Sequence, residues 1–228
     1  VLYNIAFIVI GNLVEMLLAV VLSRFASRFF KKIVQTLSFM PYFVSYVIVA
    51  SFAYILFNSG TGSFTLFVQS LGFKDFSTYG TPAIWPGIIV LVYLWKSVGY
   101  GMVVYLASVT SIDESLYEAA KIDGATIHQQ MKYITIPMLV PTLITLLLFA
   151  LGSIARGQFE LFYQLCGSQG QLYGVTDIFD TYVFRMLQGT FDVGRGTAIG
   201  LFQSLFGLIV VCTVNRIVNK YNSDYALF

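Results

Sequence analysis

Long apolar runs, each of the length that crosses a membrane, are the feature that most constrains this chain. The first run extends over residues 1–22 and contains one charged residue, Glu15. A helix of about 20 apolar residues crosses a hydrocarbon layer about 30 Å thick. Four further runs of this kind follow, at residues 39–57, 84–109, 137–154 and 197–218. We therefore expect an all-α membrane protein, a polytopic helical bundle with about five visible transmembrane helices.

The composition agrees with a lipid environment. Hydrophobic residues make up 57% of the chain and charged residues 11%, against about 25% charged residues in soluble domains, and the mean hydropathy is +0.79. The net charge of +2 and the lack of a basic tract give no reason to expect nucleic acid as a partner. Cys166 and Cys212 do not form a disulfide framework, and His128 is expected to be a surface residue, so we expect no metal site.

The distribution of basic residues predicts the orientation. The densest basic cluster, Arg24, Arg28, Lys31 and Lys32, follows the first run and places that loop in the cytoplasm. Residues 58–81 and 157–194 then lie outside, the latter with helical or turn character, and the polar residues 111–137 return to the cytoplasm. The visible chain would begin outside and carries no initiator methionine, so we expect one more helix before it and six in the intact protein. We expect residues 1–228 to form a single domain that crosses the membrane several times.

The polar segment 111–137 has the pattern of two short helices joined by a glycine bend. Ser111 begins the S-x-x-E pattern of a capping box, and Asp113 is a competing N-cap residue. Gly124 suits the left-handed residue that ends such a helix, and Thr126 begins a second capping box. The segment is therefore expected to protrude as helix, bend and helix.

One face of the first of these helices has the character of a docking surface. Ala119 and Ala120 leave a shallow face that another protein can approach closely, and Glu118 and Asp123 place charge at its rim. The alternative is an ordinary amphipathic connector between membrane helices.

The wider pattern in this segment resembles that of a known family. Residues 118–137 read EAA-x3-G-x9-I-x-I-P, which resembles the cytoplasmic EAA loop of the permease subunits of binding-protein-dependent ABC importers. The family usually has leucine where this chain has Ile136. The resemblance covers essentially the whole chain, and several phrases are similar to the oligosaccharide or multiple-sugar permeases of the carbohydrate-uptake branch. These phrases are FMPYFVS at 39–45, YLWK at 93–96 with YLA at 105–107, GQFE at 157–160, and TDI with TYV between 176 and 183.

The resemblance implies a fold and a set of partners. The fold would be that of a type I ABC importer permease, with residues 1–228 as a single multi-pass permease domain in a bacterial plasma (inner) membrane. The partners would be a second homologous permease subunit, two ATPase subunits, an extracytoplasmic solute-binding protein and a sugar or oligosaccharide. The ATPase-coupling residues would be Glu118, Ala119, Ala120, Asp123 and Gly124.

The residues themselves give no sign of an enzyme. The chain lacks the G-x-x-x-x-G-K-[ST] pattern of a P-loop, so ATP and Mg²⁺ would be bound by the partner ATPase and no cofactor by this chain. No catalytic constellation at suitable spacing is present either, which argues against a membrane hydrolase.

Two groups of residues are candidates for a substrate path. Lys96 lies near the middle of the third run, where an unpartnered ammonium costs roughly 2.5 to 3.5 kcal/mol, and Trp95 and Tyr100 beside it offer faces on which sugars stack. The alternative for Lys96 is a buried ion pair or carbonyl contact that fixes helix packing, and Glu15 is one possible partner.

The second group follows the fourth run. Gln158, Glu160 and Tyr163 combine hydrogen-bonding and aromatic groups that suit a carbohydrate. The same mixture is typical of a membrane interface, where aromatic residues collect.

Two alternatives for the function stay open at this stage. The solute could be a peptide or polyol instead of a sugar, or the chain could be a membrane scaffold or channel with a helical cytoplasmic loop.

Overall fold

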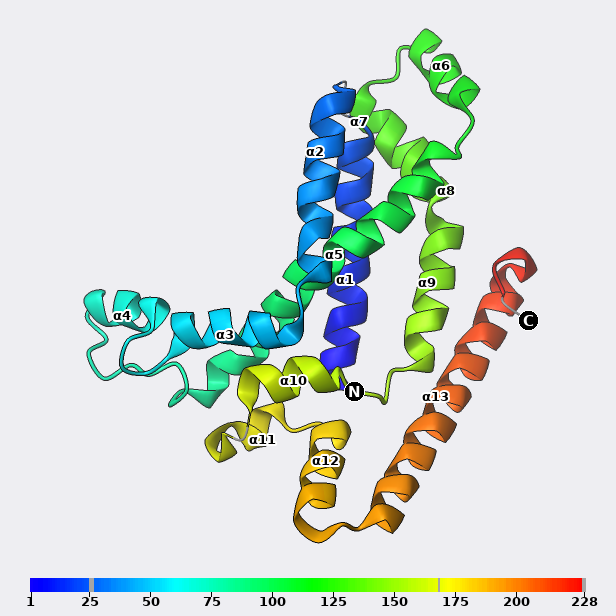
Figure 1. The fold of residues 1–228 in the computed structure, drawn as a ribbon. Helices are drawn as coiled ribbons and strands as arrows, with labels where there is room; N and C mark the ends of the chain where they lie inside the picture. Colours follow the sequence, from blue (N-terminus) through cyan, green and yellow to red (C-terminus); the bar gives the residue numbers. More distant parts are fainter. Residues whose placement is uncertain (25–26, 168, 227–228) are drawn as a thin grey trace. The chain divides into compact units, whose positions relative to one another are not determined.

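The computed structural model describes residues 1–24, 27–167 and 169–226, and all regular secondary structure in these ranges is helical (Figure 1). This confirms the all-α fold class. Three described helices are long and apolar enough to cross a membrane: α1 (Leu2–Ser23), α5 (Trp85–Thr110) with the preceding 3₁₀ turn η2 (Pro82–Ile84), and α13 (Val193–Tyr221). Two bent helix pairs bring the number of spans to five if each pair crosses as one.

The remaining elements are shorter helices. They are α2 (Arg28–Phe39), η1 (Met40–Phe43), α3 (Tyr46–Phe57), α4 (Ser63–Ser70), α6 (Glu114–Ile122), α7 (Ile127–Gln130), the π-helical turn η3 (Met131–Thr135), α8 (Ile136–Met138), α9 (Val140–Gly152), α10 (Phe159–Cys166), η4 (Gly170–Leu172), α11 (Tyr173–Thr176), α12 (Phe179–Thr190) and η5 (Ser223–Tyr225). The two segments expected outside the membrane therefore contain helices, α4 in the first and α10 to α12 in the second.

The contacts within the chain define two compact units, which are described separately. Unit 1 comprises Val1–Asn4, Val44–Tyr93 and Ile154–Leu205, and unit 2 comprises Ile5–Phe43, Leu94–Ser153 and Phe206–Phe228. The expectation of a single permease domain stays a prediction.

Unit 2 has a core shared by α1, α5 and the chain around α8. Its buried members are Met16, Ala19, Val20, Leu22, Met102, Tyr105, Leu106, Val109 and Leu139. Two glycines let the helices approach closely: a Cβ atom at Gly101 would meet the Glu15 carboxylate, and one at Gly99 would meet the backbone of Ser38 in α2. Small residues at such crossings are typical of helix packing in membranes.

Unit 1 is organised around aromatic residues. Trp85 is fully buried, its ring centroid lies 4.9 Å from that of Tyr79 and 6.2 Å from that of Phe57, and its Nε1 donates a hydrogen bond to the Thr78 carbonyl (3.0 Å). Phe162 of α10 is also buried and is met edge-on by Tyr3 at 4.8 Å. These rings hold the short helices of unit 1 together.

The second apolar run, 39–57, is not one helix as we expected. Helix α2 continues into η1, Val44 and Ser45 are not helical, and α3 begins anew with the Ser45 hydroxyl accepting a hydrogen bond from Ile48 N (3.4 Å). Serine at this place is a strong N-cap residue, so it starts a new helix in the middle of the run. Residues 28–32 of the basic cluster are helical and belong to α2, and their placement on the cytoplasmic side stays a prediction.

The fourth run also differs from our expectation. Its helix begins well before Pro137, at Ile127, and bends by 48° at Leu139, between α8 and α9. Pro137 and Pro141 both occupy first-turn positions, and because proline lacks an N–H it interrupts the ladder of the preceding turn. The two prolines therefore account for the bend.

Candidate functional site

Helix α6 begins at Asp113, one of the two caps considered above. Asp113 Oδ1 accepts a hydrogen bond from Ser115 N (2.9 Å), and this bond lowers the pKa of the Asp113 carboxyl below its ordinary value. The capping box expected from Ser111 does not form, because its hydroxyl donates to the Ser108 carbonyl of the preceding helix (2.8 Å). A carboxylate at this end of α6 is also favoured by the helix dipole.

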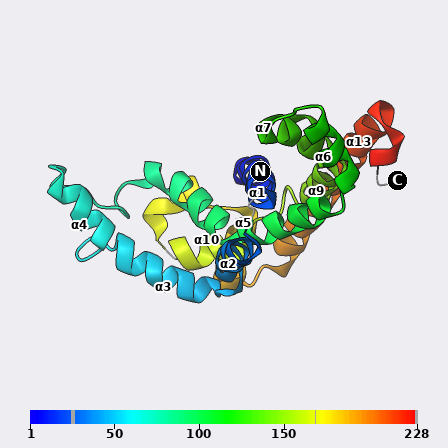
Figure 2. The ribbon, with the colours of Figure 1, turned by 90° about the horizontal axis from the view of Figure 1, so that it is seen from above.

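The bend after α6 has the geometry expected from the sequence. Gly124 has φ = +79°, in the left-handed region, and a Cβ atom there would meet nothing within 4 Å. Thr126 and Gln129 form the second capping box: Thr126 N donates to Gln129 Oε1 (2.7 Å) and Gln129 N donates to Thr126 Oγ1 (3.3 Å). Helix, glycine bend and helix are thus confirmed, as the view from above shows (Figure 2).

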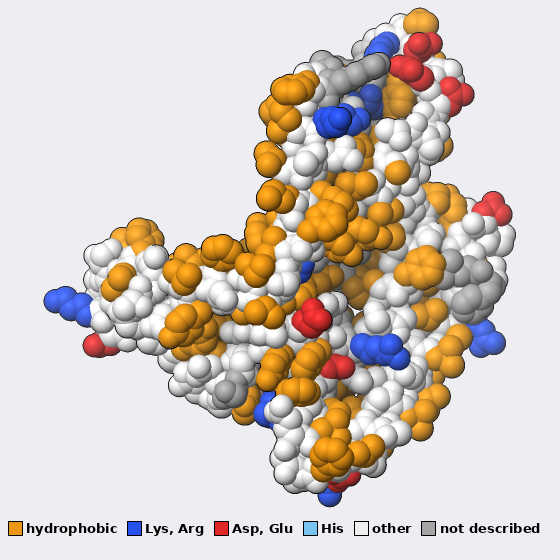
Figure 3. Space-filling model, viewed as in Figure 1, with side chains coloured by type: hydrophobic (Ala, Val, Ile, Leu, Met, Phe, Trp, Pro, Cys, Tyr) orange, Lys and Arg blue, Asp and Glu red, His pale blue; other side chains and the backbone are white. Residues whose placement is uncertain are grey.

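The face of α6 expected to dock another protein is open to solvent. No residue of α6 is buried; Glu118, Ala119, Asp123 and Gly124 are exposed, and Ala120 is partly exposed. Three apolar side chains of α6 and α7 are exposed as well, Leu116 (43%), Ile122 (86%) and Ile127 (61%). Acidic side chains gather around α6 at the top of Figure 3. Exposed apolar groups with a polar rim mark interaction sites, and we call these eight residues the docking surface.

One contact of this segment was not found from the sequence. The guanidinium of Arg24 lies 4.1 Å from the ring centroid of Tyr117 in α6, and its Nη2 donates to Thr135 Oγ1 (2.9 Å). The hydroxyls of Tyr117 and Thr135 are 3.1 Å apart. In the sequence Arg24 stands out only as part of a basic cluster, and nothing there links it to a threonine 111 positions away.

Lys96 makes the carbonyl contact that was one of its two alternatives. Its side chain is nearly buried (8% exposed), and Nζ donates to the Tyr42 carbonyl at 2.6 Å and to the Pro41 carbonyl at 3.5 Å. These carbonyls belong to the last helical turn before the break, where the backbone lacks intrahelical donors and the helix dipole favours a cation. The salt bridges given for the described residues are Arg185–Asp177 and Arg195–Asp192, and neither contains Glu15.

Trp95 and Tyr100 each expose about half of their side chains, at 52% and 50%. Tyr100 stacks on Tyr42 (5.0 Å between centroids) and on Phe39 (6.3 Å), two aromatic residues that the sequence analysis had not named as candidates. The phrase FMPYF could have pointed to them. Trp95 borders an open groove of about 420 Å³, lined by Val14, Leu18, Leu37, Ser38, Pro41, Leu94, Trp95, Val98 and Gly99.

The second candidate group lies at the start of α10 in unit 1. Gln158 and Glu160 are exposed, while Tyr163 is half-buried and stacks on Phe159 (5.2 Å) with its edge toward Phe184 (4.8 Å). Glu160 and Tyr163 thus belong to α10, and Gln158 is its N-cap residue.

Gly157, just before Gln158, is fixed by α12. Its N–H donates to Asp180 Oδ2 (2.7 Å), and a Cβ atom at this position would meet Ile178 and Asp180. Gln203 supports the same turn by donating to the Ala155 carbonyl (3.0 Å). Glycine is thus required at position 157, because Ile178 and Asp180 approach its backbone too closely for a side chain.

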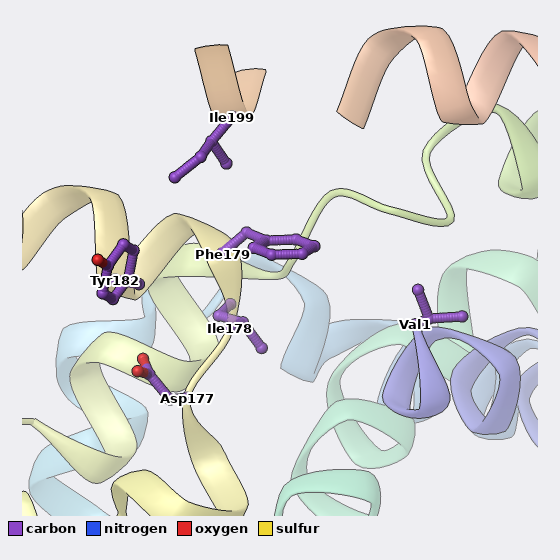
Figure 4. A pocket seen from close by; sticks show the side chains of 6 residues that line it. All are labelled: Val1, Asp177, Ile178, Phe179, Tyr182 and Ile199. Atoms are coloured by element: carbon purple, nitrogen blue, oxygen red, sulfur yellow. The ribbon is translucent and has the colours of Figure 1, made fainter. Parts of the chain in front are cut away.

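A pocket of about 530 Å³ in unit 1 is lined by Val1, Asp177, Ile178, Phe179, Tyr182 and Ile199 (Figure 4). The acidic residue of the lining, Asp177, already accepts hydrogen bonds on its carboxylate from Arg185 (2.6 and 3.0 Å) and from Thr181 (2.7 Å). Burial opposes ionisation of Asp177, but these hydrogen bonds outweigh it and hold the pKa below the ordinary value. The pocket thus offers mainly apolar and aromatic surface.

The described part of the chain contains no group of three or more His, Cys, Asp or Glu side chains able to hold a metal ion. His128 is exposed, and both cysteines are free.

Comparison with known proteins decides the family. Residues 11–223 match the family described as binding-protein-dependent transport system inner membrane component. The chain belongs to this family. It is therefore an inner membrane component of a transport system, and the match includes the docking surface and both groups of candidate residues.

The chain is similar to two proteins of Bacillus subtilis and to a solved transporter structure. The chain is 34% identical over 211 residues to protein LplB of Bacillus subtilis, and 34% identical over 213 residues to the polygalacturonan/rhamnogalacturonan transport system permease protein YteP of the same organism. Each match covers 92% of this chain and 65% of the relative, so the chain spans about two thirds of their length. A chain in the crystal structure of a bacterial alginate ABC transporter, in complex with alginate pentasaccharide-bound periplasmic protein, is 30% identical, with a TM-score of 0.88 over 96% of this chain and 75% of that one.

Proposed function

We propose that this chain is a permease subunit of an ATP-driven importer and forms the translocation path for a sugar or oligosaccharide delivered by a solute-binding protein. Membership of the family supports a role in binding-protein-dependent transport. The names of its relatives and the alginate transporter support a carbohydrate as the solute.

The observation that carries the proposal is the docking surface itself. An exposed short helix ended by a left-handed glycine, with apolar side chains on its tip and Glu118 and Asp123 beside them, is suited to a cleft on another protein. Because this chain has no P-loop, the energy for transport comes from a partner that binds ATP and Mg²⁺. We assign the docking surface to one of two ATPase subunits, and the other ATPase would contact a second homologous permease.

Transport then follows from movement of α6. Closure of the ATPase pair on ATP would displace Glu118, Ala119, Ala120, Asp123 and Gly124, and the attached membrane helices would rock so that the path opens to alternate sides. Rigid-body movement of packed helices is a common form of such transitions.

The candidate residues for the path remain the two groups defined above. Trp95 and Tyr100 present half-exposed ring faces, and Gln158, Glu160 and Tyr163 supply hydrogen-bonding groups with an aromatic ring. Ligand sites commonly combine aromatic surface with a few polar groups that fix orientation.

The proposal is tested by purification and reconstitution. We expect an ATPase, a second permease and a solute-binding protein to associate with the chain, and vesicles containing the complex to take up a sugar in an ATP-dependent manner. Uptake of peptides or polyols but not sugars would change the substrate class. Purification without any ATPase would favour a scaffold or channel and overturn the proposal.

The docking role is tested by Gly124→Asp. A side chain at φ = +79° strains the bend and adds charge to the docking surface, so uptake should fall to background while the protein remains in the membrane. Gly174→Asp is a matched control, because Gly174 is exposed, a Cβ atom there meets nothing within 4 Å, and its φ is not positive. Unchanged uptake with Gly124→Asp would refute the docking role.

A further inference from the structure

The docking helix α6 is attached to the rest of unit 2 by few groups. None of its residues is buried, and short links on either side, 111–113 and 123–126, join it to its neighbours. Among the side chains described for α6, Tyr117 is the one with a hydrogen bond to another helical element. A force applied to α6 therefore reaches the membrane helices through these links and through Tyr117.

Tyr117 joins two other elements at once. Its ring lies under the guanidinium of Arg24, the first residue after α1, and its hydroxyl meets Thr135 at the end of the π-helical turn η3. Arg24 completes the triangle by donating to Thr135 Oγ1 at 2.9 Å. The three side chains thus connect α1, α6 and η3.

The hydroxyl of Thr135 is the central atom of this arrangement. Thr135 is fully buried, and its Oγ1 can accept from Arg24 and Tyr117 while it donates to the Gln130 carbonyl at 3.4 Å. A hydroxyl has one proton and two lone pairs, so this assignment uses its full capacity. Replacing any member leaves a polar group without its partner, which makes the three act as a unit.

Both elements held by Tyr117 lead directly into the core of unit 2. Val20 and Leu22, near the end of α1, are buried in that core, and Met131 of η3 packs against it beside Leu139. A displacement of Tyr117 is therefore transmitted to packed helix and not to a free loop.

We propose that Arg24, Tyr117 and Thr135 form a clasp that transmits movement of the docking helix to α1 and to the helix that begins at η3. The inference rests on the proposed function, since it assumes that an ATPase moves α6. The clasp residues are positioning residues: they do not touch the ATPase or the solute. Without the clasp, α6 can follow the ATPase by flexing at its two links while the membrane helices stay in place.

The test uses the complete reconstituted importer and compares Tyr117→Leu with Tyr133→Leu. Tyr133 is a matched control, because it lies in the same segment and has a cation near its ring, Lys132 at 5.3 Å, but is 67% exposed. Three quantities are measured: ATPase retained on purification, basal ATP hydrolysis, and solute taken up per ATP hydrolysed. Loss of a cation–π contact and of hydrogen bonds to a charged partner predicts a fall of about tenfold in uptake per ATP for Tyr117→Leu, with the other two quantities unchanged.

Coupling between the residues gives a second readout. If Arg24 and Tyr117 act as a unit, the double variant Arg24→Leu/Tyr117→Leu should be no worse than Tyr117→Leu alone, whereas independent effects would multiply. If Tyr117→Leu fails to fold or to insert into the membrane, Tyr117→Phe and Arg24→Gln decide, since each removes fewer contacts and both should lower uptake per ATP.

The outcomes separate the two proposals. Equal uptake per ATP in Tyr117→Leu and Tyr133→Leu, with Gly124→Asp inactive, overturns the clasp and leaves the docking role in place. Loss of bound ATPase in Tyr117→Leu also overturns it, because the clasp acts after docking. Full uptake in Gly124→Asp overturns the docking role and the clasp together.

Discussion

Replacement of Lys96 by methionine separates the two functions considered for this residue. Methionine keeps the length and apolar stem of the side chain and removes the ammonium that donates to the Tyr42 carbonyl at 2.6 Å. The second acceptor, the Pro41 carbonyl at 3.5 Å, is at the limit of hydrogen bonding and contributes little. Loss of a charged donor to a part-buried carbonyl costs about 1.5 to 3 kcal/mol, and this net figure already contains the desolvation of the ammonium. We expect Lys96→Met to lower the free energy of unfolding by about 2 kcal/mol.

The assay is thermal unfolding of the purified protein together with uptake kinetics. For a chain of this length, about 2 kcal/mol corresponds to a fall in Tm of about 4 to 8 °C. Lys74→Met is the control, because Lys74 is exposed, and its Tm should not change. If Lys96 acts through helix packing, uptake falls with the amount of folded protein and the KM for the solute is unchanged. A changed KM or solute preference with an unaltered Tm would refute the packing argument and return Lys96 to the substrate path.

Two further predictions concern glycine packing and pH. Gly99→Ala should destabilise unit 2 by about 1 to 3 kcal/mol, because the new Cβ atom would meet the backbone of Ser38. Gly87→Ala on the same helix is the control, because a Cβ atom there meets nothing within 4 Å, and in thermal unfolding it should be neutral or mildly stabilising. The pKa of Asp177 is lowered in the folded state, so its carboxylate contributes stability that is present above the unfolded pKa, near pH 4, and is lost as the pH falls through the folded pKa. The Tm of the wild type should therefore exceed that of Asp177→Asn at pH 6. The difference between the two Tm values should vanish at the most acidic pH tested. A difference that persists unchanged into acid, or equal Tm values at pH 6, would contradict the role of the Arg185 pair.

The features predicted correctly from the sequence are those that neighbouring residues determine. Gly124 and the Thr126 capping box follow from backbone conformation and from hydrogen bonds that span three residues. The apolar runs at 1–22 and 84–109 correspond closely to α1 and α5 for the same reason, because length and hydropathy are local properties. The choice of Asp113 over Ser111 as N-cap was left open, since either could cap the same turn.

The features that were missed depend on partners distant in the chain. Hydropathy does not distinguish one helix over residues 39–57 from two. The break is stabilised by Ser45, which caps the second helix, and by Lys96, which lies 54 residues beyond Tyr42, whose carbonyl accepts its hydrogen bond. The clasp has the same origin, because the ring of Tyr117 is ordinary in an amphipathic helix until Arg24 lies over it.

These long-range contacts also explain why a charge inside a membrane is hard to interpret from sequence. An ammonium in hydrocarbon needs a partner, and the usual inference is a carboxylate or a ligand. A broken helix supplies a third kind of partner, because its last carbonyls have no intrahelical donor and carry the negative end of the dipole. Lys96 meets such carbonyls, so the charge and the break stabilise each other, and neither would be expected without the other. A lysine in one apolar run, combined with a helix-starting serine in another, therefore predicts a broken helix. The lysine side chain from the first run stabilises the break in the second.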